Sequence, residues 1–175
     1  MHTHYIQFFT ATCIKWLPLL NSYQAKQIIL DSLSFLVEKK RIDLYGFVIM
    51  PNHIHVIWKI GDNQEKANVQ RDFLKYTGQQ IWFHLKANDP RLLSQCEVNL
   101  KDRRYQFWKR NSLSVDLWSR EVVEQKLDYL HANPVAGKWS LVKDFTDYEY
   151  SSAAFYENNE NNFLFLTHYM ECFGA

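Results

Sequence analysis

Cysteine is scarce in this chain, and the few cysteines present show no paired spacing. Cys13, Cys96 and Cys172 are widely separated among 175 residues, and none belongs to a Cys-x-x-Cys motif. An odd number of scattered cysteines argues against a disulfide framework and against a cysteine-rich zinc site. This usage is typical of a reducing compartment, so we expect a cytoplasmic protein.

Long hydrophobic runs are also missing. No apolar stretch approaches the roughly eighteen residues that a membrane helix needs, and the segment Met1–Tyr5 lacks the basic and apolar regions of a signal peptide. The sequence contains neither a P-loop nor a Gly-x-Gly-x-x-Gly motif, which argues against the common nucleotide-binding sites. We therefore expect no membrane association.

An excess of charge of either sign is absent as well. The formal net charge is +1, from 20 Lys and Arg against 19 Asp and Glu, so any affinity for a polyanion must come from a local patch. With 47% hydrophobic residues, the chain has the composition and length of one ordinary globular domain. We expect this domain over residues 1–152, with residues 153–175 as a tail packed on it.

Hydrophobic periodicity and turn residues predict alternating strands and helices. We expect strands over 5–16, 42–50, 53–60 and 103–108, the last continued by 112–118 after a turn, and helices over 22–41, about 67–87 and 119–133. Residues 91–102 are expected to form a variable excursion. This order fits an α+β fold with a ferredoxin-like βαββαβ core, in which an antiparallel sheet carries helices on one face and the last helix lies beside it.

Two histidines share one face of the strand predicted over 53–60. His53 and His55 are two residues apart in an apolar run, and successive side chains of a strand point to opposite faces. Both imidazoles can therefore converge on one object. A metal ion is the natural candidate, because neutral imidazole is the commonest nitrogen ligand. A hydrogen-bonded structural pair is the alternative.

Two ligands are too few for a metal ion, and the last predicted helix offers more. Tyr129 and Asn133 are four residues apart and so share one helix face. This face can present a phenol and an amide oxygen to whatever the histidines bind. Two imidazoles and one carbonyl would leave coordination positions open, as a catalytic metal site requires. On ligand softness alone, these donors would also accept Zn²⁺ or Ni²⁺.

Taken together, the two motifs resemble those of a known family. Pro51-Asn52-His53-Ile54-His55, followed later by Tyr129-Leu130-His131-Ala132-Asn133-Pro134-Val135, is similar to the REP-associated tyrosine transposases, a branch of the single-tyrosine HUH transposases. The resemblance covers residues 5–152 and implies the same ferredoxin-like core. It also implies that Tyr129 is the catalytic nucleophile and that His53, His55 and Asn133 hold a divalent cation, Mg²⁺ or Mn²⁺.

The activity that this resemblance implies is metal-dependent cleavage and transfer of single-stranded DNA. The chain would form a 5′-phosphotyrosine intermediate on hairpin or repetitive palindromic DNA, as a monomer or a homodimer. One alternative is a domesticated, non-catalytic DNA- or RNA-binding module of the same fold, and another is an unrelated metal-binding regulator. The presence of His53, His55, Tyr129 and Asn133 together favours the enzyme.

The densest basic run is the best candidate for contacts to DNA. It is interleaved with aromatic residues and comprises Lys101, Arg103, Arg104, Lys109 and Arg110. Such a run can bind phosphates and stack an unpaired base, although a charged strand end is often only a solvated edge. Arg71 and Lys75 are a second candidate. His131 points about 200° away from Tyr129 around a regular helix, which leaves it either a structural residue or a contact to DNA.

Overall fold

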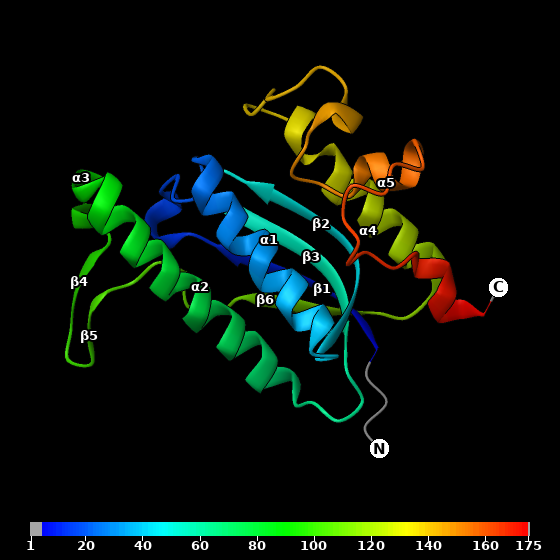
Figure 1. Ribbon diagram of the computed structural model, residues 1–175, viewed down its shortest axis with the longest axis horizontal. Helices are drawn as coiled ribbons and strands as arrows, with labels where there is room; N and C mark the ends of the chain where they lie inside the picture. The colour runs from blue at the N-terminus through cyan, green and yellow to red at the C-terminus, as the bar shows by residue number, and fades with distance from the viewer. Residues whose placement is uncertain (1–4, 175) are drawn as a thin grey trace.

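The structure is a computed structural model that describes residues 5–174 (Figure 1). Its centre is an antiparallel sheet of four strands, β2-β3-β1-β6 in spatial order. These strands are β1 (Ile6–Thr12), β2 (Ile42–Met50), β3 (His53–Ile60) and β6 (Leu113–Leu117). The strand order confirms the predicted ferredoxin-like α+β core.

Two long helices, α1 (Tyr23–Glu38) and α2 (Lys66–Asn88), cover one face of this sheet. The start of α1 is fixed by Ser22, whose side chain accepts a hydrogen bond from the backbone N–H of Ala25, as the sequence predicts for an N-cap. Alternate residues of the central strands pack under the helices in one large apolar cluster, with Phe9, Ile54, Val56 and Trp58 all fully buried or nearly so.

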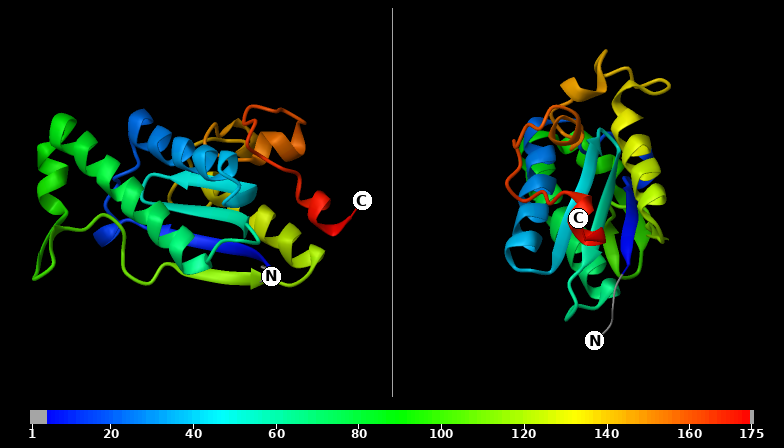
Figure 2. Two further views of the ribbon diagram at one scale, coloured as in Figure 1. Left: turned by 60° about the horizontal axis from the view of Figure 1, so that its bottom comes forward. Right: turned by 90° about the vertical axis from the view of Figure 1, so that its right-hand side faces the viewer.

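A third helix, α4 (Arg120–Ala132), lies on the opposite face, as the right-hand view of Figure 2 shows. Its apolar residues join a second cluster with Ile6, Phe8 and Ile57. Close approach to β2 depends on Gly46, because a Cβ there would lie only 2.6 Å from Cδ2 of Leu127. The prediction placed the last helix beside the sheet, and the structure makes it the cover of the second face.

The fourth strand of the sheet is β6, which lies within the predicted continuation 112–118, whereas the predicted first part, 103–108, contributes no strand to this sheet. β5 (Arg103–Tyr105) pairs instead with β4 (Glu97–Leu100) in a separate hairpin that follows α3 (Pro90–Gln95). This hairpin projects beyond the sheet in the left-hand view of Figure 2. The alternation in 103–108 has another cause: Trp108 turns inward, and its Nε1–H donates to the Thr77 hydroxyl at 3.0 Å.

The first strand also ends earlier than predicted. β1 stops at Thr12, and a 3₁₀ turn, η1 (Ile14–Trp16), follows it. Lys15 and Trp16 adopt positive φ angles of 52° and 57°, which a strand cannot accommodate.

The remainder of the chain wraps the edge of β2 with short elements. These are η2 (Asn133–Val135), η3 (Phe145–Asp147), α5 (Ala153–Glu157) and η4 (Tyr169–Phe173). Leu166 reaches the first core cluster and forms a bridge with Leu44. The three cysteines are free. No helix within residues 5–174 combines the length and the apolar character that crossing a bilayer requires.

Candidate active site

The two histidines of β3 lie side by side on the face that α4 covers. Their ring centroids are 4.9 Å apart, and the side chains are almost buried, at 9% exposure for His53 and 6% for His55. Ile54 and Val56 point to the other face and join the core cluster under α1 and α2. The alternation predicted from the sequence therefore holds along this strand.

The end of α4 brings Tyr129 and Asn133 to these histidines. The Tyr129 ring lies 5.4 Å from the His55 ring between centroids, and Oδ1 of Asn133 lies 3.1 Å from Nε2 of His53. Tyr129 is 54% exposed, so its side chain sits at the border between the buried imidazoles and solvent. The four residues predicted to share one site do meet in space.

The second nitrogen of each imidazole is held by a neighbour. Nδ1–H of His53 is 2.7 Å from Oδ1 of Asn52, and Nδ1 of His55 shares a 2.7 Å hydrogen bond with the Thr10 hydroxyl. Nε2 is therefore the nitrogen that each ring leaves for a ligand. Hydrogen bonds of this kind fix the orientation and tautomer of ligating histidines. These roles of Asn52 and Thr10 depend on contacts that the sequence pattern does not show.

Burial keeps both imidazoles neutral. It lowers the pKa of His53, and the hydrogen bond to Asn133 opposes this shift. It lowers the pKa of His55 to about 3, and the electrostatic influence of His53 and Lys126 lowers that pKa further. A neutral imidazole has the free lone pair that a metal ligand needs.

The donor set fits a divalent cation. The amide of Asn133 is oriented by its N–H bond to the carbonyl of Tyr129, and that of Asn52 by an N–H bond to the carbonyl of Trp16. Both amide oxygens therefore point at His53, whose neutral ring can donate to only one of them. With Asn52 taking that proton, Nε2 of His53 keeps a lone pair, so this nitrogen and the oxygen of Asn133 could both bind one cation.

The separation of these two atoms agrees with that assignment. Nε2 of His53 and Oδ1 of Asn133 are 3.1 Å apart, so both atoms could contact one bound cation. Within residues 5–174, no three His, Cys, Asp or Glu side chains gather to hold a metal ion. Besides His53 and His55, the chain offers the amide oxygen of Asn133 as a further donor at this place.

Three further side chains surround Tyr129 and the histidines. Phe8 stacks against His55 at 5.0 Å and meets the Tyr129 ring at 5.9 Å, and Lys126 places its ammonium over the rings of both Phe8 and Tyr129. Trp139 lies on the other side, 6.4 Å from His53 between ring centroids. Helical spacing relates Lys126 to Tyr129, but only the strand register reveals Phe8.

His131 belongs to the framework of the site. It is 4% exposed, and its Nε2 shares a 2.8 Å hydrogen bond with the hydroxyl of Ser152. Ser152 in turn accepts the backbone N–H of Phe47 in β2. This chain of contacts ties the last turn of α4, which carries Tyr129, to the sheet. Of the two roles left open for His131, the structure supports the structural one.

A basic groove of about 800 Å³ runs between α2 and the segment that leads into β6. Its positively charged lining residues are Arg71, Lys75, Arg103, Lys109 and Arg110. The groove thus joins both basic candidates of the sequence, but Lys101 and Arg104 lie outside its lining. The backbone N–H of Lys109 donates to the carbonyl of Thr12, the residue paired with His53, so this end of the groove adjoins the site.

Ion pairs divide the cations of this region into two classes. Arg71, Arg103 and Arg104 pair with Asp72, Asp102 and Glu97, respectively. Over residues 5–174, no carboxylate forms an ion pair with Lys75, Lys109 or Arg110. These three are the groove cations whose charge remains available to a ligand.

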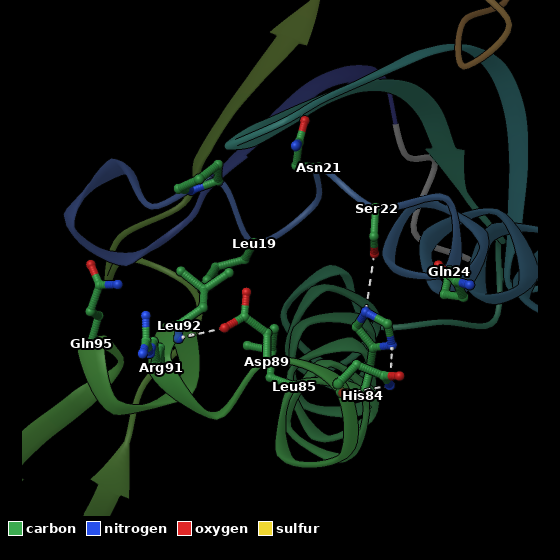
Figure 3. A pocket seen from close by; sticks show the side chains of 12 residues that line it. Leu19, Asn21, Ser22, Gln24, His84, Leu85, Asp89, Arg91, Leu92 and Gln95 are labelled. Carbon is green, nitrogen blue, oxygen red and sulfur yellow. Dashed lines mark hydrogen bonds between the residues drawn. The ribbon is translucent and has the colours of Figure 1, made fainter.

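A second hollow, of about 600 Å³, lies between the start of α1 and the ends of α2 and α3 (Figure 3). Its one histidine, His84, is held by the hydroxyl of Ser22 at 3.1 Å and by the side-chain amide of Asn88 at 3.3 Å. These contacts explain His84 as a structural residue.

Comparisons with known proteins place this fold. No family model matches the sequence, and no curated protein matches it. A solved structure of the REP-associated tyrosine transposase bound to a REP hairpin is similar at a TM-score of 0.63 and 18% identity, covering 86% of this chain and 78% of that one.

A second similar structure is that of a presumed transposase from Deinococcus radiodurans. The TM-score is 0.51 at 9% identity, and the match covers 74% of this chain and 90% of the other. Both likenesses concern the fold, and both neighbours are described as transposases. The chain therefore has the fold of the REP-associated tyrosine transposase.

Proposed function

We propose that this chain is a metal-dependent endonuclease and strand transferase that acts on single-stranded regions of hairpin or repetitive palindromic DNA. One observation carries the proposal: the rings of Tyr129 and His55 lie 5.4 Å apart, beside a contact between His53 and Asn133, in a transposase fold. Hairpin DNA is the proposed substrate because the similar structure contains a REP hairpin.

Tyr129 would supply the nucleophile. Its phenol oxygen attacks the scissile phosphorus and gives up its proton to solvent, while the bond from phosphorus to O3′ breaks. The bonding electrons leave on O3′, which takes up a proton to become a free 3′-hydroxyl. The 5′-phosphate stays on Tyr129 as a phosphodiester. Attack by a 3′-hydroxyl on this linkage reverses the step and joins strands, so no nucleoside triphosphate is needed.

His53, His55 and Asn133 would hold the cation, Mg²⁺ or Mn²⁺. When bound, such a cation neutralises charge on the scissile phosphate. The chain's own contribution is orientation: Asn52 and Thr10 fix the imidazoles, and burial keeps them neutral. The exposure of Tyr129 leaves room for a DNA strand beside them.

The basic groove would bind the phosphates of the DNA next to the cleavage site. Lys75, Lys109 and Arg110 carry charge that no ion pair offsets within the described residues. Lys109 adjoins Thr12, which faces His53 across the sheet. Arg103 would contribute from the rim of the groove, whereas Lys101 and Arg104 on the hairpin are expected to contribute less.

A covalent adduct is the decisive test. Labelled hairpin oligonucleotides incubated with the protein and Mn²⁺ should give a protein–DNA adduct that survives denaturation. Tyr129→Phe should abolish it without changing hairpin affinity, because the phenyl ring keeps its packing on Phe8. His53→Ala should suppress the metal-dependent reaction. Hairpin binding by the wild type with no adduct under any metal condition would instead identify a non-catalytic binding module.

A further inference from the structure

Lys126 stands at the edge of the candidate site in a position that neither core packing nor an ion pair explains. It lies one turn before Tyr129 on α4, and its Nζ is 5.0 Å from the centroid of the Phe8 ring and 5.4 Å from that of Tyr129. The two rings are 5.9 Å apart. The ammonium therefore sits over the same small surface that carries the phenol.

The charge of Lys126 is not balanced by an ion pair in the part of the chain that the structure describes. Over residues 5–174, no carboxylate forms an ion pair with it. Asp128 is near in sequence but lines a different hollow with Glu124 and His131. An ammonium that has no ion-pair partner can bind an anionic group that approaches Tyr129.

We propose that Lys126 is a further catalytic residue whose ammonium binds a non-bridging oxygen of the scissile phosphate next to Tyr129. This inference rests on the function proposed above and adds a charge to the site that the protein itself supplies. The negative charge on the phosphate oxygens must be stabilised as the phenol oxygen of Tyr129 attacks. Lys126 approaches from the Phe8 side, whereas His53 and Asn133 lie on the side of Trp139.

The competing explanation is that Lys126 only packs on aromatic rings. The chain offers a matched control, because Lys86 places its Nζ 4.8 Å from the centroid of the Trp82 ring on α2. Both lysines lie over an aromatic ring of their own helix, but only Lys126 lies near Tyr129. A packing role predicts similar consequences for the two substitutions, and a catalytic role predicts different ones.

The first experiment removes the charge and keeps the aliphatic stem. Lys126→Met should slow single-turnover formation of the covalent adduct by about 100-fold, the effect of losing one preorganised group that stabilises developing charge. Hairpin affinity, measured separately, should hardly change. Lys126→Arg, which restores a cation, should recover most of the rate, and Lys86→Met should leave it unchanged. An unchanged rate in Lys126→Met, or a loss confined to hairpin affinity, would overturn the proposal.

The second experiment probes the contact from the side of the DNA. Replacing one non-bridging oxygen of the scissile phosphate by methyl gives two diastereomers, and one of them lacks the oxygen that Lys126 binds. For that diastereomer, the effects of the methyl group and of Lys126→Met should not add, because both remove the same contact. Additive effects with both diastereomers would overturn the inference.

The two experiments separate this inference from the function on which it rests. Adduct formation by wild type and by Lys126→Met at equal rates would leave the proposed function standing and remove Lys126 from it. Absence of any adduct from the wild type would remove both.

Discussion

Phe8 and Phe9 are neighbours in β1 and lie on opposite faces of one sheet. Phe9 is fully buried and stacks on Trp58, with ring centroids 4.9 Å apart, in the cluster that α1 and α2 cover. Phe8 is 3% exposed, yet it contacts His55, Tyr129 and Lys126. One face of the sheet packs into the main core, and on the other face the same strands carry residues of the candidate site.

The difference lies in how completely each face is covered. Two long helices close the first face, whereas the second face is covered by α4 and by parts of the C-terminal segment, which leave Leu113 at 58% and Val115 at 40% exposure on β6. Tyr129 sits where this cover ends. An incomplete cover lets imidazoles stay buried and neutral while the phenol beside them reaches solvent. The candidate site therefore depends on the position at which the cover formed by α4 ends.

The largest expected effect comes from the closed face. Phe9→Ala should lower the free energy of unfolding by about 3 to 5 kcal/mol, because it removes a fully buried aromatic side chain and leaves a cavity. Urea denaturation measures this loss. The folded fraction should form the DNA adduct at the wild-type rate.

Phe8→Ala should also destabilise the fold, but it should slow formation of the adduct as well, because Tyr129 and Lys126 pack on Phe8. Equal effects of both variants on the adduct rate would remove the contrast between the faces.

The next largest effect should be a loss of folding stability at acid pH, caused by the buried histidines on the side of the sheet that α4 covers. Burial lowers the pKa of His131 to about 4, and the pKa of His55 falls to about 3, from an ordinary value of 6.5. Below that value the unfolded chain takes up protons that the folded chain does not, so stability falls as pH falls. The loss should reach about 1.4 kcal/mol per pH unit for each histidine between about pH 6.5 and about pH 5.

A single substitution assigns part of this slope. His131 contacts the hydroxyl of Ser152 and the ring of Tyr156, whose pKa is raised by burial, so both stay neutral in this pH range. Glu124, Asp128 and Glu157 line the same hollow, but burial is what lowers the pKa of His131. His131→Gln keeps a polar partner for Ser152 and should flatten the dependence by about 1.4 kcal/mol per pH unit. Urea denaturation at several pH values measures it. An unchanged slope would contradict the buried, neutral state of His131.

Local spacing allowed much of the site to be predicted. A period of two residues places His53 and His55 on one face, and a helical period aligns Tyr129 with Asn133. The face of the sheet that α4 would cover was beyond such reasoning, because it depends on the close approach at Gly46. The roles of Thr10 and Phe8 were also hidden, since they follow from the register between β1 and β3.

The error over residues 103–108, the predicted first part of the fourth strand, has a similar origin. Alternating residues near 103–108 resemble a strand, but Phe107 and Trp108 pack against Gly78 of α2 instead of joining the sheet. Packing partners distant in sequence decided that segment, and periodicity carries no information about them.

Substitution of Asn52, which orients His53, should have an effect of intermediate size. Asn52 is 5% exposed and accepts the Nδ1–H of His53 at 2.7 Å. Asn52→Ala frees that ring and should raise the Mn²⁺ concentration needed for adduct formation by about 10- to 100-fold, the usual cost of losing such a partner. Asn52→Asp keeps an acceptor and should be milder. Mn²⁺ titration of the adduct rate distinguishes them, and equal Mn²⁺ dependence in Asn52→Ala and wild type would argue against this role.

The smallest effect should come from substituting single cations of the basic groove. This test asks whether bound DNA reaches the groove as well as the face of the sheet that α4 covers. Lys109 lines the groove, and Lys101 on the β4–β5 hairpin does not. If Lys109 binds one phosphate, Lys109→Ala should weaken hairpin binding only several-fold but should reduce the slope of log affinity against log salt by about 1. Lys101→Ala is the matched control and should leave the slope unchanged. Hairpin binding measured over a series of salt concentrations gives both slopes.

Equal reductions of the slope by both substitutions would place DNA on the β4–β5 hairpin as well as in the groove. No reduction of the slope by either substitution would confine DNA contacts to the α4 face of the sheet.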